Sequence, residues 1–118
     1  MAKYLVLIYG DEAAWQAAPA EWHAANGLRH QALIAAERPS IRSVEELEPA
    51  ARAVSIRADA TGRAYTTDGP FLETKEVIGG YYLLDAPDMA EAIRIASQIP
   101  EATAAHGGVE IRPIAVQG

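Results

Sequence analysis

Two segments of the chain are apolar at consecutive positions, which is the pattern of strands covered on both faces. They span residues 4–9 and 78–84. The segment 54–57 alternates instead, with Val54 and Ile56 on one parity, and this pattern predicts a half-exposed strand. Further extended segments are predicted at residues 40–44, at 64–67 as the hairpin partner of 54–57, and at 109–116.

Helical spacing covers residues 19–37 and 88–99. Pro19 suits the first turn of the first helix, and Asp88 with Glu91 three residues later is typical of a capping box. A short helical turn capped by Asp11 is expected before the first helix. The apolar stripe predicted for the first helix consists of Trp22, Ala25, Ala32 and Ala36, widened by Leu28, Leu33 and Ile34.

The order of these elements is strand, helix, strand or hairpin, strand, helix, strand. It predicts an α+β fold, a ferredoxin-like split βαβ with an antiparallel sheet and both helices on one face. Helices on one face cannot cover both sides of the strands 4–9 and 78–84. We therefore expect a second copy to pack on the other sheet face as a two-fold homodimer, with a small-molecule cavity nearby.

Composition narrows the classes of partner. With 118 residues, half of them hydrophobic, the chain supports one domain over residues 1–118. Ten Lys and Arg against sixteen Asp and Glu give 10 − 16 = −6, which disfavours a nucleic-acid partner. No apolar run approaches the roughly 20 residues of a membrane span, and no signal-peptide pattern is present, so a cytoplasmic location without membrane contact is expected.

The segment from Thr67 to Glu76 combines a predicted turn with a cluster of charged residues. Gly69 before Pro70 predicts a sharp reversal, because the residue before a proline avoids the helical region and glycine accepts unusual backbone angles. Charged residues then crowd in front of the apolar run 78–84. This loop is expected to place polar side chains at the beginning of the buried strand 78–84.

Three segments resemble the DGPF-type members of the YCII-related family: Lys3-Tyr4-Leu5-Val6-Leu7-Ile8-Tyr9-Gly10-Asp11-Glu12, Asp68-Gly69-Pro70-Phe71-Leu72-Glu73-Thr74-Lys75-Glu76, and Gly79-Gly80-Tyr81. The resemblance covers nearly the whole chain. It implies a dimeric α/β barrel of ferredoxin-like topology, in agreement with the dimer argued from strand parity. It does not assign a biochemical role.

The same resemblance implies a histidine and an aspartate in a pocket between elements. Asp68 is the candidate aspartate, whereas the relatives' helical histidine falls near Gly27, with His23 and His30 one turn to either side. Asp68 is either a general acid or base or an Asx-turn residue that fixes the backbone. His30 is either its partner in proton transfer or an ordinary surface or core histidine.

Other side chains are candidates for binding a ligand. Lys75 is either an anchor for a substrate anion or one member of a solvated charge cluster. Tyr9, Phe71 and Tyr81 are candidate lining residues. His23 and His30 lie about 10.5 Å apart along a helix by the 1.5 Å rise, too far to share one ion, and cysteine is absent, so we expect no metal and no cofactor.

Two hypotheses about function remain open, and they leave open whether the protein is an enzyme. The first is a homodimeric protein or enzyme that holds a small polar ligand between the first helix, the sheet and the loop after Asp68, with Asp68 as acid or base. The second is a non-catalytic regulatory module, because the family resemblance implies a link to extracytoplasmic-function sigma factors.

Overall fold

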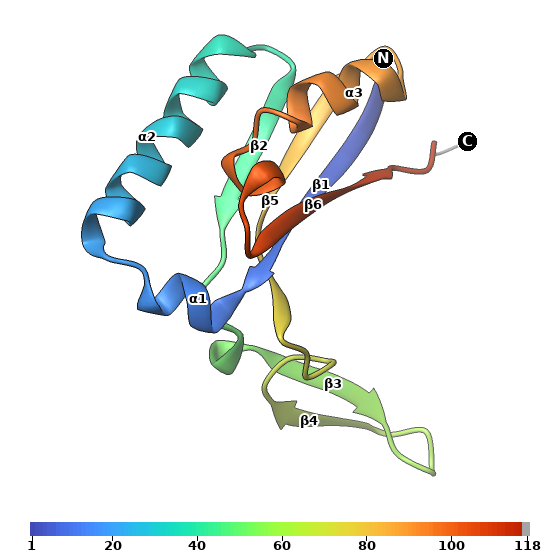
Figure 1. Ribbon diagram of the computed structural model, residues 1–118. Coiled ribbons are helices and arrows are strands. Elements are labelled where there is room, and N and C mark those ends of the chain that lie inside the picture. Colours follow the sequence, from blue (N-terminus) through green and yellow to red (C-terminus); the bar gives the residue numbers. More distant parts are fainter. Residues whose placement is uncertain (117–118) are drawn as a thin grey trace.

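The computed structural model describes residues 1–116 as an α+β fold with antiparallel sheets (Figure 1). A four-stranded sheet and a two-stranded sheet are joined by three α-helices and two short 3-10 helices. The elements are β1 Ala2–Asp11, α1 Glu12–Ala17, α2 Ala20–Ala36, β2 Ile41–Glu46, η1 Ala50–Arg52, β3 Val54–Ala58, β4 Ala64–Asp68, β5 Glu76–Ala86, α3 Met89–Ala96, η2 Pro100–Thr103 and β6 Gly107–Pro113.

The four-stranded sheet has the order β2-β5-β1-β6, so β5 lies between β1 and β2 and every neighbouring pair is antiparallel. Val6 lies opposite Tyr82 and Tyr4 opposite Leu84 in the β1–β5 register. These side chains form the core together with residues of both long helices and the segment after them: Leu33, Ala92, Ile95, Ala96 and Ile99. Helices α2 and α3 therefore share one face of the sheet.

The opposite face of the sheet has no layer over it in residues 1–116. Its centre is a patch of Leu5, Leu7, Tyr81 and Leu83, all only partly buried, which we call the open sheet face. Leu5 is paired with Leu83 and Leu7 with Tyr81, so the four side chains adjoin. The apolar residues on both parities of β1 and β5 thus serve a core on one side and this patch on the other.

Helix α2 presents a different face to the sheet from the one that the sequence predicted. Trp22, Leu28 and the alanines of the predicted stripe are exposed, and Leu33 is the buried residue of the helix. The side turned inward also carries Asn26 and His30. The prediction is confirmed for Leu33 and Ile34, which pack against the core, and was wrong for Trp22, Leu28 and the alanines. The two polar side chains find polar partners on the body, so the inner face of α2 is not the most apolar one.

Trp15 of α1 lies against two glycines of the sheet. A Cβ atom built on Gly10 would be 2.1 Å from Trp15 Cζ2, and one built on Gly79 would be 2.5 Å from Trp15 Cζ3. On β5 the next residue, Gly80, faces the backbone instead, because its Cβ would be 2.7 Å from the carbonyl oxygen of Glu45. Gly10 and Gly79 therefore leave room for the Trp15 indole to pack closely on the sheet, and this contact fixes α1 on the end of β1.

We expect Gly10→Ala to lower the free energy of unfolding by about 1–3 kcal/mol, the usual cost of an added methyl group in a close-packed contact. Gly27→Ala is the matched control, since a Cβ at this position in α2 meets nothing within 4 Å. Removing a glycine from a helix interior stabilises by up to about 1 kcal/mol. Urea unfolding of the two variants measures the difference. Equal unfolding midpoints for Gly10→Ala and Gly27→Ala would contradict the close packing of Trp15 on Gly10.

Strands β3 and β4, with the turn between them, form a separate two-stranded sheet that projects from the rest of the protein (Figure 1). We call residues 54–68 the hairpin arm. The Cα radius of gyration is 16.3 Å, against about 13.5 Å for a compact chain of this length. The burial of β3 is the reverse of the prediction: Ser55 is buried, while Val54 and Ile56 are exposed, because the body leaves their side of the arm bare.

Candidate functional site

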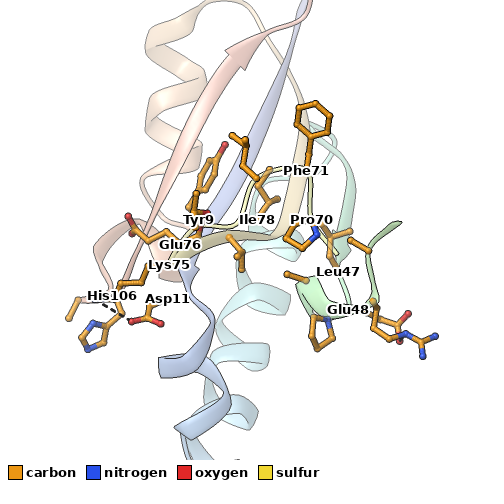
Figure 2. A pocket seen from close by; sticks show the side chains of 18 residues that line it. Tyr9, Asp11, Leu47, Glu48, Pro70, Phe71, Lys75, Glu76, Ile78 and His106 are labelled. Atoms are coloured by element: carbon orange, nitrogen blue, oxygen red, sulfur yellow. Dashed lines mark hydrogen bonds and ion pairs between the residues drawn. The ribbon is translucent and has the colours of Figure 1, made fainter. Parts of the chain in front are cut away.

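A groove of about 1110 Å³ lies where the base of the hairpin arm meets the end of the four-stranded sheet (Figure 2). Its walls are mainly apolar and come from the segment after β2, the loop before β5 and β5 itself, for example Leu47, Pro70, Phe71 and Ile78. Polar side chains gather at one end, namely Asp11, Lys75, Glu76 and His106. Glu48 and Arg52 line the groove at the other end, so the groove is an apolar trough with charged side chains at both ends.

Asp11 organises the end that carries Lys75. Its Oδ1 accepts hydrogen bonds from the N–H groups of Ala13 (3.1 Å) and Ala14 (3.4 Å), so it caps α1. Its Oδ2 lies 3.7 Å from Lys75 Nζ, and its own backbone N–H donates to the carbonyl of His106 at 2.9 Å. The Lys75 side chain is 81% exposed. Asp11 is thus occupied by structural contacts, whereas most of the Lys75 ammonium faces the solvent of the groove.

The loop after Asp68 is fixed to β3 at its start. Gly69 has φ +101°, a conformation that favours glycine, and its N–H donates to the carbonyl of Ala53 at 2.7 Å. Ser55 Oγ donates to the carbonyl of Gly69 at 2.8 Å. The Arg57 guanidinium carbon lies 3.8 Å from the centre of the Phe71 ring, a cation–π contact. These contacts hold the wall of the groove in place.

The predicted binding residues separate into two places. Tyr9, Phe71 and Lys75 line the groove, whereas Tyr81 belongs to the open sheet face. Asp68 is exposed at the end of β4, does not line the groove, and makes no side-chain hydrogen bond within residues 1–116. The first helices do not line the groove either, so its walls differ from those predicted.

His30 lies in a second polar cluster, between α2 and the sheet. Its Nδ1 is 2.5 Å from the hydroxyl of Tyr82, and its Nε2 is 2.8 Å from Glu101 Oε1. Asn26 Nδ2 donates to Glu101 Oε2 at 2.8 Å. The predicted pairing of His30 with Asp68 is therefore not found: the partner carboxylate is Glu101 of η2. His23, the other candidate, has its Nε2 2.9 Å from the carbonyl oxygen of Trp15.

Two groups of this cluster have shifted pKa values, the carboxyl of Glu101 and the phenol of Tyr82. Burial disfavours the charged form of Glu101, but hydrogen bonds from His30 and Asn26 outweigh it and lower the pKa of the carboxyl. Burial, and then the charge of Glu101, raise the pKa of the Tyr82 phenol far above its ordinary value. With Glu101 ionised, His30 donates to its carboxylate through Nε2, and the protonated Tyr82 hydroxyl is the hydrogen-bond partner of His30 Nδ1.

Sequence reasoning missed Glu101, because no motif surrounds it and a charged residue directly after Ile99-Pro100 would ordinarily be exposed. Glu101 is only 6% exposed. Apart from His30, its Oε1 has no polar partner within residues 1–116. Tyr82 is fully buried, so a substrate has no access to its hydroxyl. The arrangement ties α2 to η2 and β5 and is suited to holding the fold together.

Neither a metal site nor a membrane helix is found in the part of the chain that the structure describes. Among residues 1–116, no three His, Asp or Glu side chains converge in a way that could hold a metal ion. None of the helices in these residues has the length and apolar character needed to cross a membrane.

Comparison with known proteins gives one family. A family model described as the YCII-related domain matches residues 2–116. An uncharacterised protein of Rhizobium meliloti (strain 1021) is 34% identical over 118 aligned residues, which span 96% of this chain and 92% of the relative. The resemblance noted in the sequence is thereby confirmed, and this chain belongs to the YCII-related family.

Proposed function

We propose that this YCII-related protein is a homodimer that binds a small molecule with an apolar body and one anionic group in the groove. The observation that carries the proposal is the groove itself, a mainly apolar trough of about 1110 Å³ with the exposed Lys75 among the polar side chains at one end. Small-molecule sites are typically mostly apolar concavities with a few polar groups that orient the ligand.

The roles of the lining residues follow from their positions. Phe71 and Ile78 offer apolar surface for the body of the ligand. Lys75 offers its ammonium to the anionic group, because its one carboxylate contact, Asp11, is distant at 3.7 Å and already caps α1. Tyr9 also lines the groove, with its ring directed away from this end (Figure 2). The ligand is oriented with its charge toward Lys75.

A proton-transfer role for Asp68 is part of the proposal. Its carboxylate is exposed and free of side-chain hydrogen bonds within residues 1–116, and it directly precedes the Gly69-Pro70 turn that leads into the groove wall. Because Asp68 does not line the groove, it can give or take a proton only with a ligand that extends past the Gly69-Pro70 turn to its carboxylate.

The homodimer is supported by the open sheet face. Leu5, Leu7, Tyr81 and Leu83 adjoin on a sheet that has helices only on its other side. A second copy that packs its own open sheet face on this one would bury both patches and produce the dimeric α/β barrel that the family resemblance implies.

A thermal-shift series tests the ligand. Acetate, hexanoate, octanoate and benzoate are compared with chloride at equal ionic strength, and we expect stabilisation to grow with the apolar body. A probe at ten times its Kd adds about 1.4 kcal/mol, which raises Tm by roughly 5 °C. Lys75→Ala should abolish the shift, whereas Lys3→Ala, the control at the other lysine of the chain, should retain it.

Two outcomes would contradict parts of this proposal. Equal shifts for acetate and octanoate, or an unchanged shift in Lys75→Ala, would exclude the proposed ligand class. Equal stabilisation of the wild type and of Asp68→Asn across pH 4–9 would exclude a charge-dependent role for Asp68. If none of the probes stabilises the protein, the regulatory module becomes the favoured hypothesis.

A further inference from the structure

The hairpin arm exposes an unusual concentration of large apolar side chains. Val54, Ile56 and Tyr65 on the arm, and Phe71 and Leu72 just after it, have exposed fractions between 44% and 67%. A two-stranded hairpin alone is marginally stable in water, and exposed apolar patches on soluble proteins commonly mark interaction surfaces. The arm therefore has the composition of an element that is covered by something else.

Both faces of the arm are bare beyond its base. Val54 and Ile56, with Thr66 and Asp68 opposite them, form one face, and Arg57 with Tyr65 opposite forms the other. The hydrogen bonds from Gly69 to Ala53 and from Ser55 to Gly69 close the base of the arm, and the rest of it projects away from the four-stranded sheet (Figure 1). Its own body does not cover it, so the cover must come from another molecule.

Charge indicates which molecule. Residues 49–72, which contain the arm and its flanks, carry three arginines and two aspartates, a net charge of 3 − 2 = +1. The remaining residues carry seven basic and fourteen acidic side chains, a net charge of 7 − 14 = −7. The arm and the body of the same chain are thus of opposite charge, and the body of a second copy is an acceptor of complementary charge.

Apolar surface and symmetry favour the same acceptor. Beside the sheet-to-sheet contact, Tyr81 carries apolar surface to the β2 margin of the open sheet face. Glu45, which is paired with Tyr81, is exposed there and makes no ion pair within residues 1–116. A two-fold dimer makes every contact twice, so one complementary pair of surfaces provides two contacts.

We propose that the hairpin arm of each protomer docks on the body of a second copy, at the margin of its open sheet face, with Ile56 in the apolar contact and Arg63 of the arm tip toward acidic side chains such as Glu45. This rests on the homodimer proposed above and is independent of the ligand. In the resulting dimer, the hairpin arm of each protomer contacts the body of the other, and we call this arrangement the clasp.

Sedimentation equilibrium of two matched variants tests the clasp. Ile56→Glu places a charge in the proposed contact, and we expect it to raise the dimer Kd at least about tenfold. Ile93→Glu makes the same change at a 50% exposed site on α3 and should alter Kd less than about twofold. Equal effects of the two variants on a dimeric wild type would overturn the clasp and leave the dimer standing, whereas a monomeric wild type would overturn both.

A second measurement locates the contact without depending on affinity. The chain has no cysteine, so Ala60→Cys at the tip of the arm carries a single nitroxide label. Mixed with isotope-labelled protein that lacks the nitroxide, it should broaden amide signals of the β2 margin in the other copy. Absence of intermolecular broadening at micromolar concentrations above the dimer Kd would refute the docking. The thermal-shift series with acetate, hexanoate, octanoate and benzoate tests ligand binding in the groove independently of this result.

Discussion

Glu101→Ala is expected to lower the free energy of unfolding by about 3 kcal/mol, because removing one partner of a buried charged network leaves the others without compensation. Glu101 is buried between His30 and Asn26, and its contacts connect α2 to η2. Since α2 buries only Leu33 fully, this cluster carries an unusually large share of the attachment of the helix.

Urea unfolding at pH 7 measures the effect, with Glu48→Ala as the control. Glu48 is exposed, and its nearest cation, Arg52, is 3.9 Å away, so its loss should change stability by less than about 0.5 kcal/mol. A matching small effect at Glu101 would show that the cluster contributes little. His30→Gln should also lower the free energy of unfolding, by less than Glu101→Ala. The variant that carries both changes should lose less stability than the sum of the two single losses.

The pH dependence of this stabilisation has a definite sign. The pKa of Glu101 is lower in the folded protein than its ordinary value of 4.5. Its contribution is therefore fully present above about pH 4.5 and declines as the pH falls through the folded pKa. The difference between wild type and Glu101→Ala should shrink below pH 4.5, and a difference that stayed constant down to pH 2 would contradict the assignment.

Leu7→Arg is expected to convert the proposed homodimer to a monomer, with a rise in the dimer Kd of about a thousandfold. Leu7 lies between Tyr81 and Glu110 near the middle of the open sheet face. In a face-to-face dimer this change removes a buried leucine and forces a guanidinium into an apolar contact, which together cost roughly 4 kcal/mol or more.

Light scattering at micromolar concentration measures the change in mass. Leu28→Arg is the control, because Leu28 is 65% exposed on α2 and lies on the side of the helix away from the sheet. A Leu7→Arg protein that keeps the wild-type mass would exclude the open sheet face as the dimer interface. Loss of mass in both variants would indicate an effect that is not specific to this face.

The strands could be predicted because their signals are local. The apolar runs at 4–9 and 78–84 and the turn at 59–62 correspond to β1, β5 and the tip of the hairpin arm, and Asp88 does cap α3 by accepting the Glu91 N–H at 2.9 Å. The helical face of α2 could not be predicted, because its inward polar residues depend on Glu101, which lies 75 positions from Asn26 along the chain.

The partner of His30 was mispredicted for a related reason. Asp68 stood out through its Gly-Pro context, whereas Glu101 had no motif around it and became a candidate only when η2 folded against α2. The reversed burial of Val54 and Ile56 has another cause: an alternating pattern identifies the apolar side of a strand but not whether the same molecule covers it.

The position of β1 in the sheet also has a consequence for synthesis. Strand β1 lies between β5 and β6, and both of these strands are synthesised long after it. At roughly 5–20 residues per second, the apolar segment from Tyr4 to Tyr9 waits on the order of 5–20 s before its second neighbour exists. During that time it is an exposed apolar segment that chaperones can bind, and the four-stranded sheet forms only after β6 has been synthesised.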